Sequence, residues 1–152
     1  MKESEAVRLD LRAPLEYAEN AGLDPFVNTA GEGEASRELL FCFEVDGEQA
    51  GRIDPEADRF LGELVFSGMA DAEQGDAQPN TLILPAGLYL FAQRRRFLGR
   101  DECIGLAMEQ QKDGLWERHR LDSRLYIRRL FEDSSEVTQI FRPLAHPRRG
   151  GA

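Results

Sequence analysis

The segment Thr81–Gln93, TLILPAGLYLFAQ, decides the fold class of this chain. An apolar run is interrupted by Pro85-Ala86-Gly87 and then resumes with side chains alternating between two sides, as in a strand. Because proline cannot donate to a sheet ladder, we expect a bulge, an edge or an early strand position at the break. A helix-like segment, Arg100–Lys112, and two more strand-like runs follow. The order from Thr81 onward is therefore strand, helix, strand, strand.

The last two strand-like runs predict which side chains share a face of the sheet. In Arg124–Phe131, RLYIRRLF, alternation places Leu125 and Ile127 on one side and Tyr126 and Arg128 on the other. Glu136–Leu144 then closes the sheet. Gly114 is expected to end the preceding helix, because glycine is favoured just after a helix C-terminus.

The first half can be written in the same order. Val7–Leu11 alternates like a strand, and Ala13–Ala21 is interpreted as a helix that opens at Pro14 and stops at Gly22. Two further strands are expected, at Arg37–Val45 and Phe60–Met69.

These patterns predict an α+β fold. We expect an antiparallel sheet with helices on one face, built from two β-α-β-β modules with a ligand cleft between them. The modules would span about residues 1–75 and 80–144, because the segment 70–80 has no periodicity and several breakers. Together they would form one domain, 1–144, followed by a loose tail, 145–152.

Composition limits the class of protein. The chain has 152 residues, of which 41% are hydrophobic and 31% charged, values typical of a globular domain. The net charge of −9 opposes nucleic-acid binding by the whole surface, since phosphates require a cationic face. No apolar run is long enough to span a membrane. Met1 is followed by Lys-Glu-Ser-Glu rather than an apolar signal region, so we expect a cytoplasmic protein.

Reactive side chains are sparse. Cys42 and Cys103 lie in apolar contexts and should be buried free thiols. His119 and His146 are the only histidines, and neither has metal-ligand spacing to another suitable residue, so we expect no metal site. No nucleophile motif is present, and we assign no catalytic residue and no cofactor. The basic cluster of Arg94–Arg96 with Arg100 could touch an anionic partner or form a solvated turn.

The second half resembles the GyrI-like (gyrase-inhibitor-like) small-molecule-binding family, whose domain is also the effector domain of AraC-type and MerR-type regulators. Leu84–Tyr89, LPAGLY, is similar to the Pro-x-Gly-x-Tyr strand start of that family. The helix that ends near Gly114, the strand through Leu130–Asp133 and the closing strand Glu136–Leu144 match in spacing. The resemblance covers about the last 65 residues, and the first half matches in approximate element order.

The resemblance implies two modules around a cleft that holds flat, often cationic, ligands. It implies a stand-alone protein that senses or sequesters a planar organic ligand in an aromatic cleft, without a DNA-binding domain of its own. The candidate ligand-binding residues are Tyr89, Trp116, Tyr126, Arg128 and Glu63. The aromatic members could instead be ordinary core residues.

Arg128 marks a departure from the family pattern. Many members place a glutamate near this position, where it compensates a cationic ligand. An arginine would repel a cation and could clamp a carboxylate or phosphate, or it could be an exposed strand residue. If the cleft needs an acid, Glu63 on the preceding strand is the substitute.

Two other functions stay open. Some GyrI-like proteins hydrolyse electrophilic small molecules with a cleft acid, but this chain has no acid at the aligned position. A gyrase-interacting protein, whose acidic surface imitates nucleic acid, is compatible with the charge of −9. Expected partners are thus a small organic ligand and either DNA gyrase or a separate regulator, and binding is favoured over catalysis.

Overall fold

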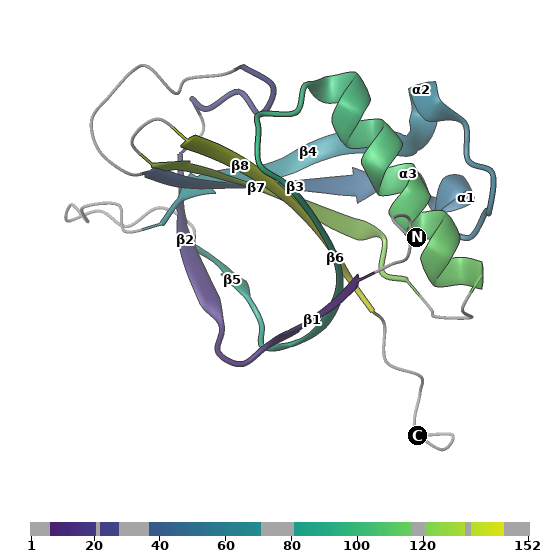
Figure 1. The fold of residues 1–152 in the computed structure, drawn as a ribbon, viewed down its shortest axis with the longest axis horizontal. Coiled ribbons are helices and arrows are strands. Elements are labelled where there is room, and N and C mark those ends of the chain that lie inside the picture. The colour runs from purple at the N-terminus through teal and green to yellow at the C-terminus, as the bar shows by residue number, and fades with distance from the viewer. Residues whose placement is uncertain are drawn as a thin grey trace.

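The computed structural model describes residues 7–20, 22–27, 37–70, 81–116, 121–132 and 135–144. Within these segments the backbone forms one antiparallel sheet with helices against one of its faces (Figure 1). In chain order the elements are β1 (Val7–Leu11), β2 (Leu15–Glu19), β3 (Arg37–Val45), α1 (Gly47–Ala50), α2 (Ala57–Phe60), β4 (Leu61–Met69), β5 (Thr81–Leu84), β6 (Gly87–Arg94), α3 (Arg100–Trp116), β7 (Arg124–Glu132) and β8 (Ser135–Pro143).

The sheet curls until its two ends meet. Its strand order is β1-β6-β8-β7-β3-β4-β2-β5, so β1 and β2 lie six positions apart. In a flat sheet six strand spacings would take about 29 Å. Only residues 12–14 join β1 to β2, and such a link reaches at most about 14 Å. The sheet must therefore bend round, and Figure 1 shows β2, β5, β1 and β6 turned back beneath the central strands.

The chain bends between β1 and β2 and again between β5 and β6, and these two bends lie opposite each other. β1 pairs with β6 as far as Leu11 opposite Gly87, and β2 pairs with β5 from Leu15 opposite Leu84. Gly87 has a φ of 145°, which residues with a side chain rarely adopt. The break predicted from Pro85-Ala86-Gly87 is thus confirmed, and it takes the form of a bend between two strands.

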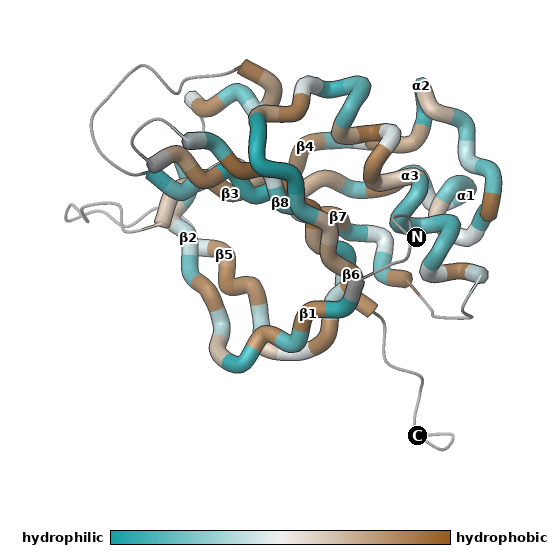
Figure 2. The backbone as a smooth tube through the Cα atoms, in the orientation of Figure 1, coloured by the Kyte–Doolittle hydropathy of each residue, from teal (hydrophilic) through white to brown (hydrophobic). Residues whose placement is uncertain are grey.

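Alternation along the central strands separates two cores on opposite faces of the sheet. The outer core lies under the helices and includes Phe41 of β3 and Ile104 of α3. The inner core fills the concave face, called here the inner face, and includes Tyr17 of β2 and Tyr126 of β7. Strands buried on both faces are expected to carry near-continuous apolar runs, and Figure 2 shows such runs along the sheet.

A buried arginine connects the outer loops to the sheet. Arg129 of β7 is 1% exposed, and its Nη1 donates to Thr138 Oγ1 at 2.7 Å. Its Nη2 donates to the carbonyl oxygen of Pro25 at 2.7 Å, and its guanidinium lies 4.0 Å from the Phe97 ring centre. Burial lowers the pKa of Arg129, because the charged form loses hydration. These contacts hold both the segment 22–27 and the β6–α3 connection against the sheet.

Two predictions of local structure are wrong. Ala13–Ala21 is not a helix, because Leu15–Glu19 forms a strand that pairs with β4 and β5. Gly114 does not end the long helix, since α3 continues to Trp116. A Cβ at Gly114 would lie 2.6 Å from Leu90 Cδ1, so glycine serves the close packing of α3 on β6 rather than a helix stop.

The coarse architecture is as predicted. The chain is an α+β protein in which every described strand pair is antiparallel. The second half differs from the predicted strand–helix–strand–strand order in that two strands, β5 and β6, precede α3, and the first half places three strands before its short helices. Cys42 and Cys103 are free and buried, as expected.

No helix in the described segments is long and apolar enough to cross a membrane. The predicted tail 145–152 and residues 71–80 of the predicted seam lie outside the described residues.

We expect Gly68→Ala to destabilise the protein, because Gly68 lies where β2 closes against β4. A Cβ there would collide with the carbonyl oxygen of Ala18 and would lie 2.7 Å from the Phe66 ring. A backbone carbonyl cannot move aside as a flexible side chain can. The free energy of unfolding, measured by urea denaturation, should fall by about 2–3 kcal/mol.

Gly105→Ala is the matched control. Gly105 lies within α3, and no atom is within 4 Å of the place its Cβ would take. Alanine should therefore raise the free energy of unfolding by about 1 kcal/mol through helix propensity. Equal effects of the two substitutions would contradict the close approach of β2 at Gly68.

Candidate functional site

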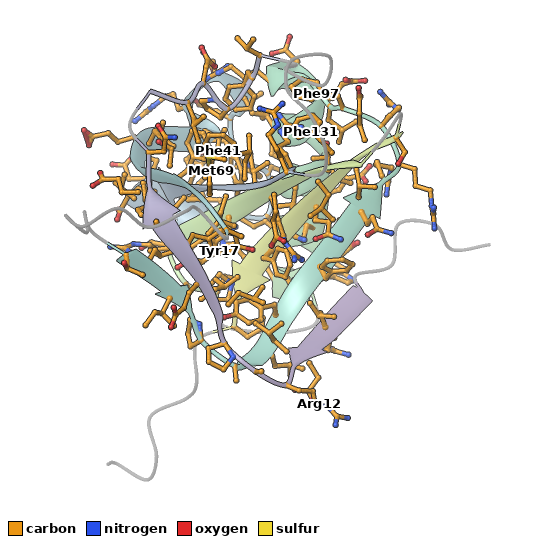
Figure 3. The ribbon with its side chains drawn as sticks, turned by 90° about the vertical axis from the view of Figure 1, so that its left-hand side faces the viewer. Arg12, Tyr17, Phe41, Met69, Phe97 and Phe131 are labelled. Carbon is orange, nitrogen blue, oxygen red and sulfur yellow. The ribbon has the colours of Figure 1, made fainter. Side chains whose placement is uncertain are left out.

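All three tyrosines of the chain lie in the inner core. Tyr17, Tyr89 and Tyr126 come from β2, β6 and β7 and are 1%, 3% and 7% exposed. Phe141 of β8 joins them, with its ring edge-on to Tyr89 at a centroid distance of 5.7 Å. Figure 3 shows Tyr17 pointing into the curl. The inner face thus combines aromatic surface with hydroxyl groups, a lining typical of sites for organic molecules.

A chain of hydrogen bonds crosses the inner face beside these rings. The Tyr17 hydroxyl donates to Glu38 Oε2. Arg128 reaches the same oxygen, with Nη2 at 2.7 Å and Nε at 2.8 Å. Arg128 Nη1 donates to Gln139 Oε1 at 2.9 Å, and Gln139 Nε2 donates to Gln93 Oε1 at 2.6 Å. We call these five residues the inner polar network.

The ion pair at the centre of this network is asymmetric. Its donors converge on Glu38 Oε2, so within the described contacts Glu38 Oε1 is left for a further donor. The side chains of Glu38 and Arg128 are 28% and 19% exposed, which means that both stay partly hydrated. The Arg128 guanidinium also lies 6.0 Å from the Phe141 ring centre, at the limit of a cation–π contact. The pair is half-buried and retains hydrogen-bonding capacity.

Burial keeps the hydroxyl and thiol groups of the inner face protonated. It is the largest cause that raises the pKa of Tyr17, with the hydrogen bond to Glu38 as the next cause. Burial likewise raises the pKa of Tyr89, and it raises the pKa of Tyr126 to about 12. Cys42, opposite Tyr126 in the β3–β7 pairing, has its pKa raised to about 11 by burial. At neutral pH these groups are hydrogen-bond donors rather than nucleophiles.

The structure brings together three of the five residues that the sequence singles out. Tyr89, Tyr126 and Arg128 lie on the inner face. Trp116 ends α3, the helix on the other face of the sheet, and its side chain is 74% exposed. Glu63 is exposed on β4, and no described contact joins it to the inner polar network.

Four residues of the inner polar network are not singled out by the sequence: Tyr17, Glu38, Gln93 and Gln139. Tyr17 falls in the segment interpreted as a helix, although Leu15 and Tyr17 have the spacing of two residues on one face of a strand. Glu38 meets Arg128 across 90 residues of sequence, and only the β3–β7 register sets that contact. One signal in the sequence points to a missing residue. Arg128 shares a strand face with Tyr126, and a half-buried guanidinium needs an acidic partner such as Glu38.

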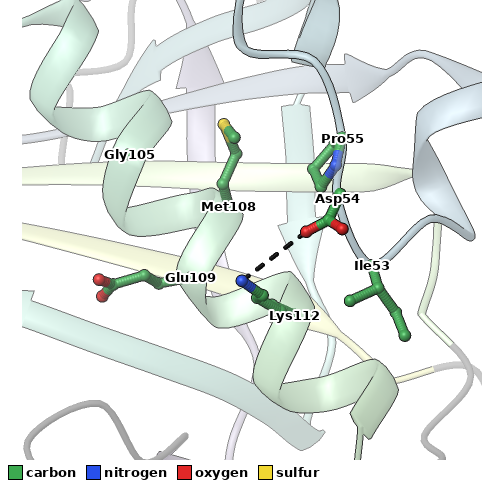
Figure 4. A pocket seen from close by; sticks show the side chains of 7 residues that line it. All are labelled: Ile53, Asp54, Pro55, Gly105, Met108, Glu109 and Lys112. Atoms are coloured by element: carbon green, nitrogen blue, oxygen red, sulfur yellow. Dashed lines mark ion pairs between the residues drawn. The ribbon is translucent and has the colours of Figure 1, made fainter.

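A groove lies on the other side of the molecule, between α3 and the connection from α1 to α2 (Figure 4). It is a groove of about 220 Å³, and an ion pair of 3.7 Å between Lys112 Nζ and Asp54 Oδ1 crosses its rim. Buried Gln111 fixes one wall by donating to the carbonyl oxygens of Gln49 and Arg52. The lining holds no aromatic ring, so the inner face is the stronger candidate for an organic ligand. The lining residues are Ile53, Asp54, Pro55, Gly105, Met108, Glu109 and Lys112.

Neither a known relative nor a metal-binding cluster identifies the site. No family model matches the sequence, and a search of curated proteins found no match. Within the described segments, no group of three His, Cys, Asp or Glu side chains could hold a metal ion. The function is therefore inferred from the geometry of the inner face.

We expect the three tyrosines to ionise late. In the folded protein, ultraviolet titration should show no tyrosine with the ordinary pKa of about 10, because burial raises all three. A tyrosine that ionises near that value while the protein is folded would contradict the burial.

Stability should fall at alkaline pH for the same reason. The unfolded chain loses the Cys42 proton near 9.0, whereas the folded chain holds it to about 11. The stabilisation is thus complete below about pH 9 and is lost as pH rises toward 11, by at most about 1.4 kcal/mol per pH unit for each group. Burial also raises the pKa of Cys103. Urea denaturation across this range measures the loss, and Cys42→Ala should remove the share that Cys42 contributes. An unchanged profile in Cys42→Ala would contradict the assignment.

Proposed function

We propose that the protein binds a small planar organic molecule on the inner face of its curled sheet. The observation that carries this proposal is the half-buried Arg128–Glu38 pair beside three tyrosines. Partly buried charges cost desolvation free energy, and apolar residues of similar size would stabilise a purely structural core at least as well. A binding site gives such a pair a use, because it orients a polar ligand.

The inner polar network suggests which ligands are favoured. A ring would lie at the edge of the inner core, against partly exposed Phe91 and beside Tyr126, the most exposed of the three tyrosines, where stacked or edge-on contacts are favourable. A donor on the ligand would meet Glu38 Oε1. Since Glu38 neutralises Arg128, the site favours ligands that are neutral or zwitterionic over strongly charged ones.

As part of this proposal, the two halves of the chain form two GyrI-like modules with the ligand cleft between them. Both halves of the chain supply the inner face, with Tyr17 and Glu38 from the first half and Tyr89, Tyr126 and Arg128 from the second. A sensing or sequestering role follows from the resemblance, as does a separate regulator or DNA gyrase as a partner.

Fluorescence anisotropy with a panel of neutral, zwitterionic and charged planar dyes tests the proposal. We expect neutral or zwitterionic dyes to bind best. Tyr126→Ala and Arg128→Gln should each weaken that binding about ten-fold or more, because they remove a ring or a charged hydrogen-bond partner. Tyr126→Phe keeps the ring and the packing, so it should weaken binding less.

Trp116→Ala is the matched control, since it removes an aromatic side chain that is 74% exposed on another face. It should leave the affinity unchanged. Loss of binding in Trp116→Ala with none in folded Tyr126→Ala and Arg128→Gln would rule out the inner face.

A further inference from the structure

The basic run Arg94-Arg95-Arg96 takes no part in the inner face, and the structure places it beside a groove. β6 ends at Arg94 opposite Thr138, whereas β8 begins three residues earlier, at Ser135. The β6–α3 connection diverges from β8 there, which leaves a groove of about 350 Å³. Its lining consists of Arg95, Arg96, Ser135, Glu136 and Val137.

We propose that this groove binds the phosphate or carboxylate group of a small organic molecule. Arg95 makes no ion pair or hydrogen bond with the described residues, and its side chain is exposed. Arg96 uses Nη1 on Glu102 Oε2 at 2.9 Å, so its Nε and Nη2 remain as donors. Guanidinium groups bind phosphate and carboxylate oxygens through paired hydrogen bonds, and two adjacent arginines can hold one such group between them.

The backbone that carries these arginines is fixed by buried contacts. Thr138 is fully buried, and its Oγ1 donates to the carbonyl oxygen of Arg96 at 2.9 Å. Thr138 Oγ1 also accepts hydrogen bonds from Leu98 N at 3.2 Å and from Arg129 Nη1 at 2.7 Å. Phe97, which lies between Arg96 and Leu98 in the chain, packs on the Arg129 guanidinium. Because the connection is already ordered, an anion would pay little entropy to organise it.

The charges around the groove select a small ligand. Glu136 also lines the groove, beside Arg95 and Arg96. Two guanidinium groups against one carboxylate give the lining a net positive charge. The whole chain carries a net charge of −9, which repels a long polyanion such as nucleic acid beyond the groove itself. A small phosphate- or carboxylate-bearing molecule avoids that repulsion.

Calorimetric titration with sodium pyrophosphate and, separately, with citrate tests this site at constant ionic strength. At least one of the two anions should bind, and added salt should weaken binding. The tighter of the two identifies phosphate or carboxylate as the preferred group. Arg95→Gln should weaken binding about ten-fold or more, because it removes a charged donor with no other described role.

Arg12→Gln is the matched control, because it removes the same charge from an exposed position at the bend between β1 and β2 (Figure 3). It should leave anion binding unchanged, as should Tyr126→Ala, which separates this site from the inner face. The proposal is overturned if wild-type protein binds neither anion, or if Arg12→Gln weakens binding as much as Arg95→Gln. It is also overturned if a single-stranded oligonucleotide binds more tightly than both anions.

Discussion

The link of three residues between β1 and β2 is the constraint on which the rest of this structure depends. Two strands so close in sequence cannot lie six positions apart unless the sheet curls. The curl needs a bend at Gly87, whose φ residues with a side chain rarely adopt, and a close backbone approach at Gly68, where a Cβ would collide with the carbonyl oxygen of Ala18. It also creates the inner face, because it carries Tyr17 across to strands that lie far from β2 in a flat sheet.

Two neighbouring arginines on β7 show how the two faces differ. Arg128 points to the inner face and Arg129 to the outer face, as adjacent residues of a strand do. Arg129 is 1% exposed, and both of its Nη atoms and its guanidinium plane are held by a hydroxyl, a carbonyl and an aromatic ring, so its role is to hold the structure together. Arg128 is half-buried beside a carboxylate that keeps one oxygen for another donor. That difference supports binding at the inner face.

The sequence predicts the strands whose stability comes from burial on both faces. The run Arg37–Val45 and the alternation in Arg124–Phe131 fall within β3 and β7, and the proline-glycine break falls at the bend. The sequence could not reveal β2, because its pairing with β4 and β5 outweighs a local pattern that suggests a helix. It singled out only some of the residues that gather on the inner face. Tyr89, Tyr126 and Arg128 stand out locally, whereas Glu38 meets Arg128 only through a register set across 90 residues.

Fluorine NMR of protein labelled with 3-fluorotyrosine and 5-fluorotryptophan is the sharpest test of ligand binding at the inner face. All three tyrosines lie on that face, and the single tryptophan does not. When a planar dye that the protein binds is added, the resonances of Tyr17, Tyr89 and Tyr126 should shift together, with the Trp116 resonance unchanged. A shift confined to Trp116, with the three tyrosine resonances unmoved at saturation, would contradict the inner face as the binding site.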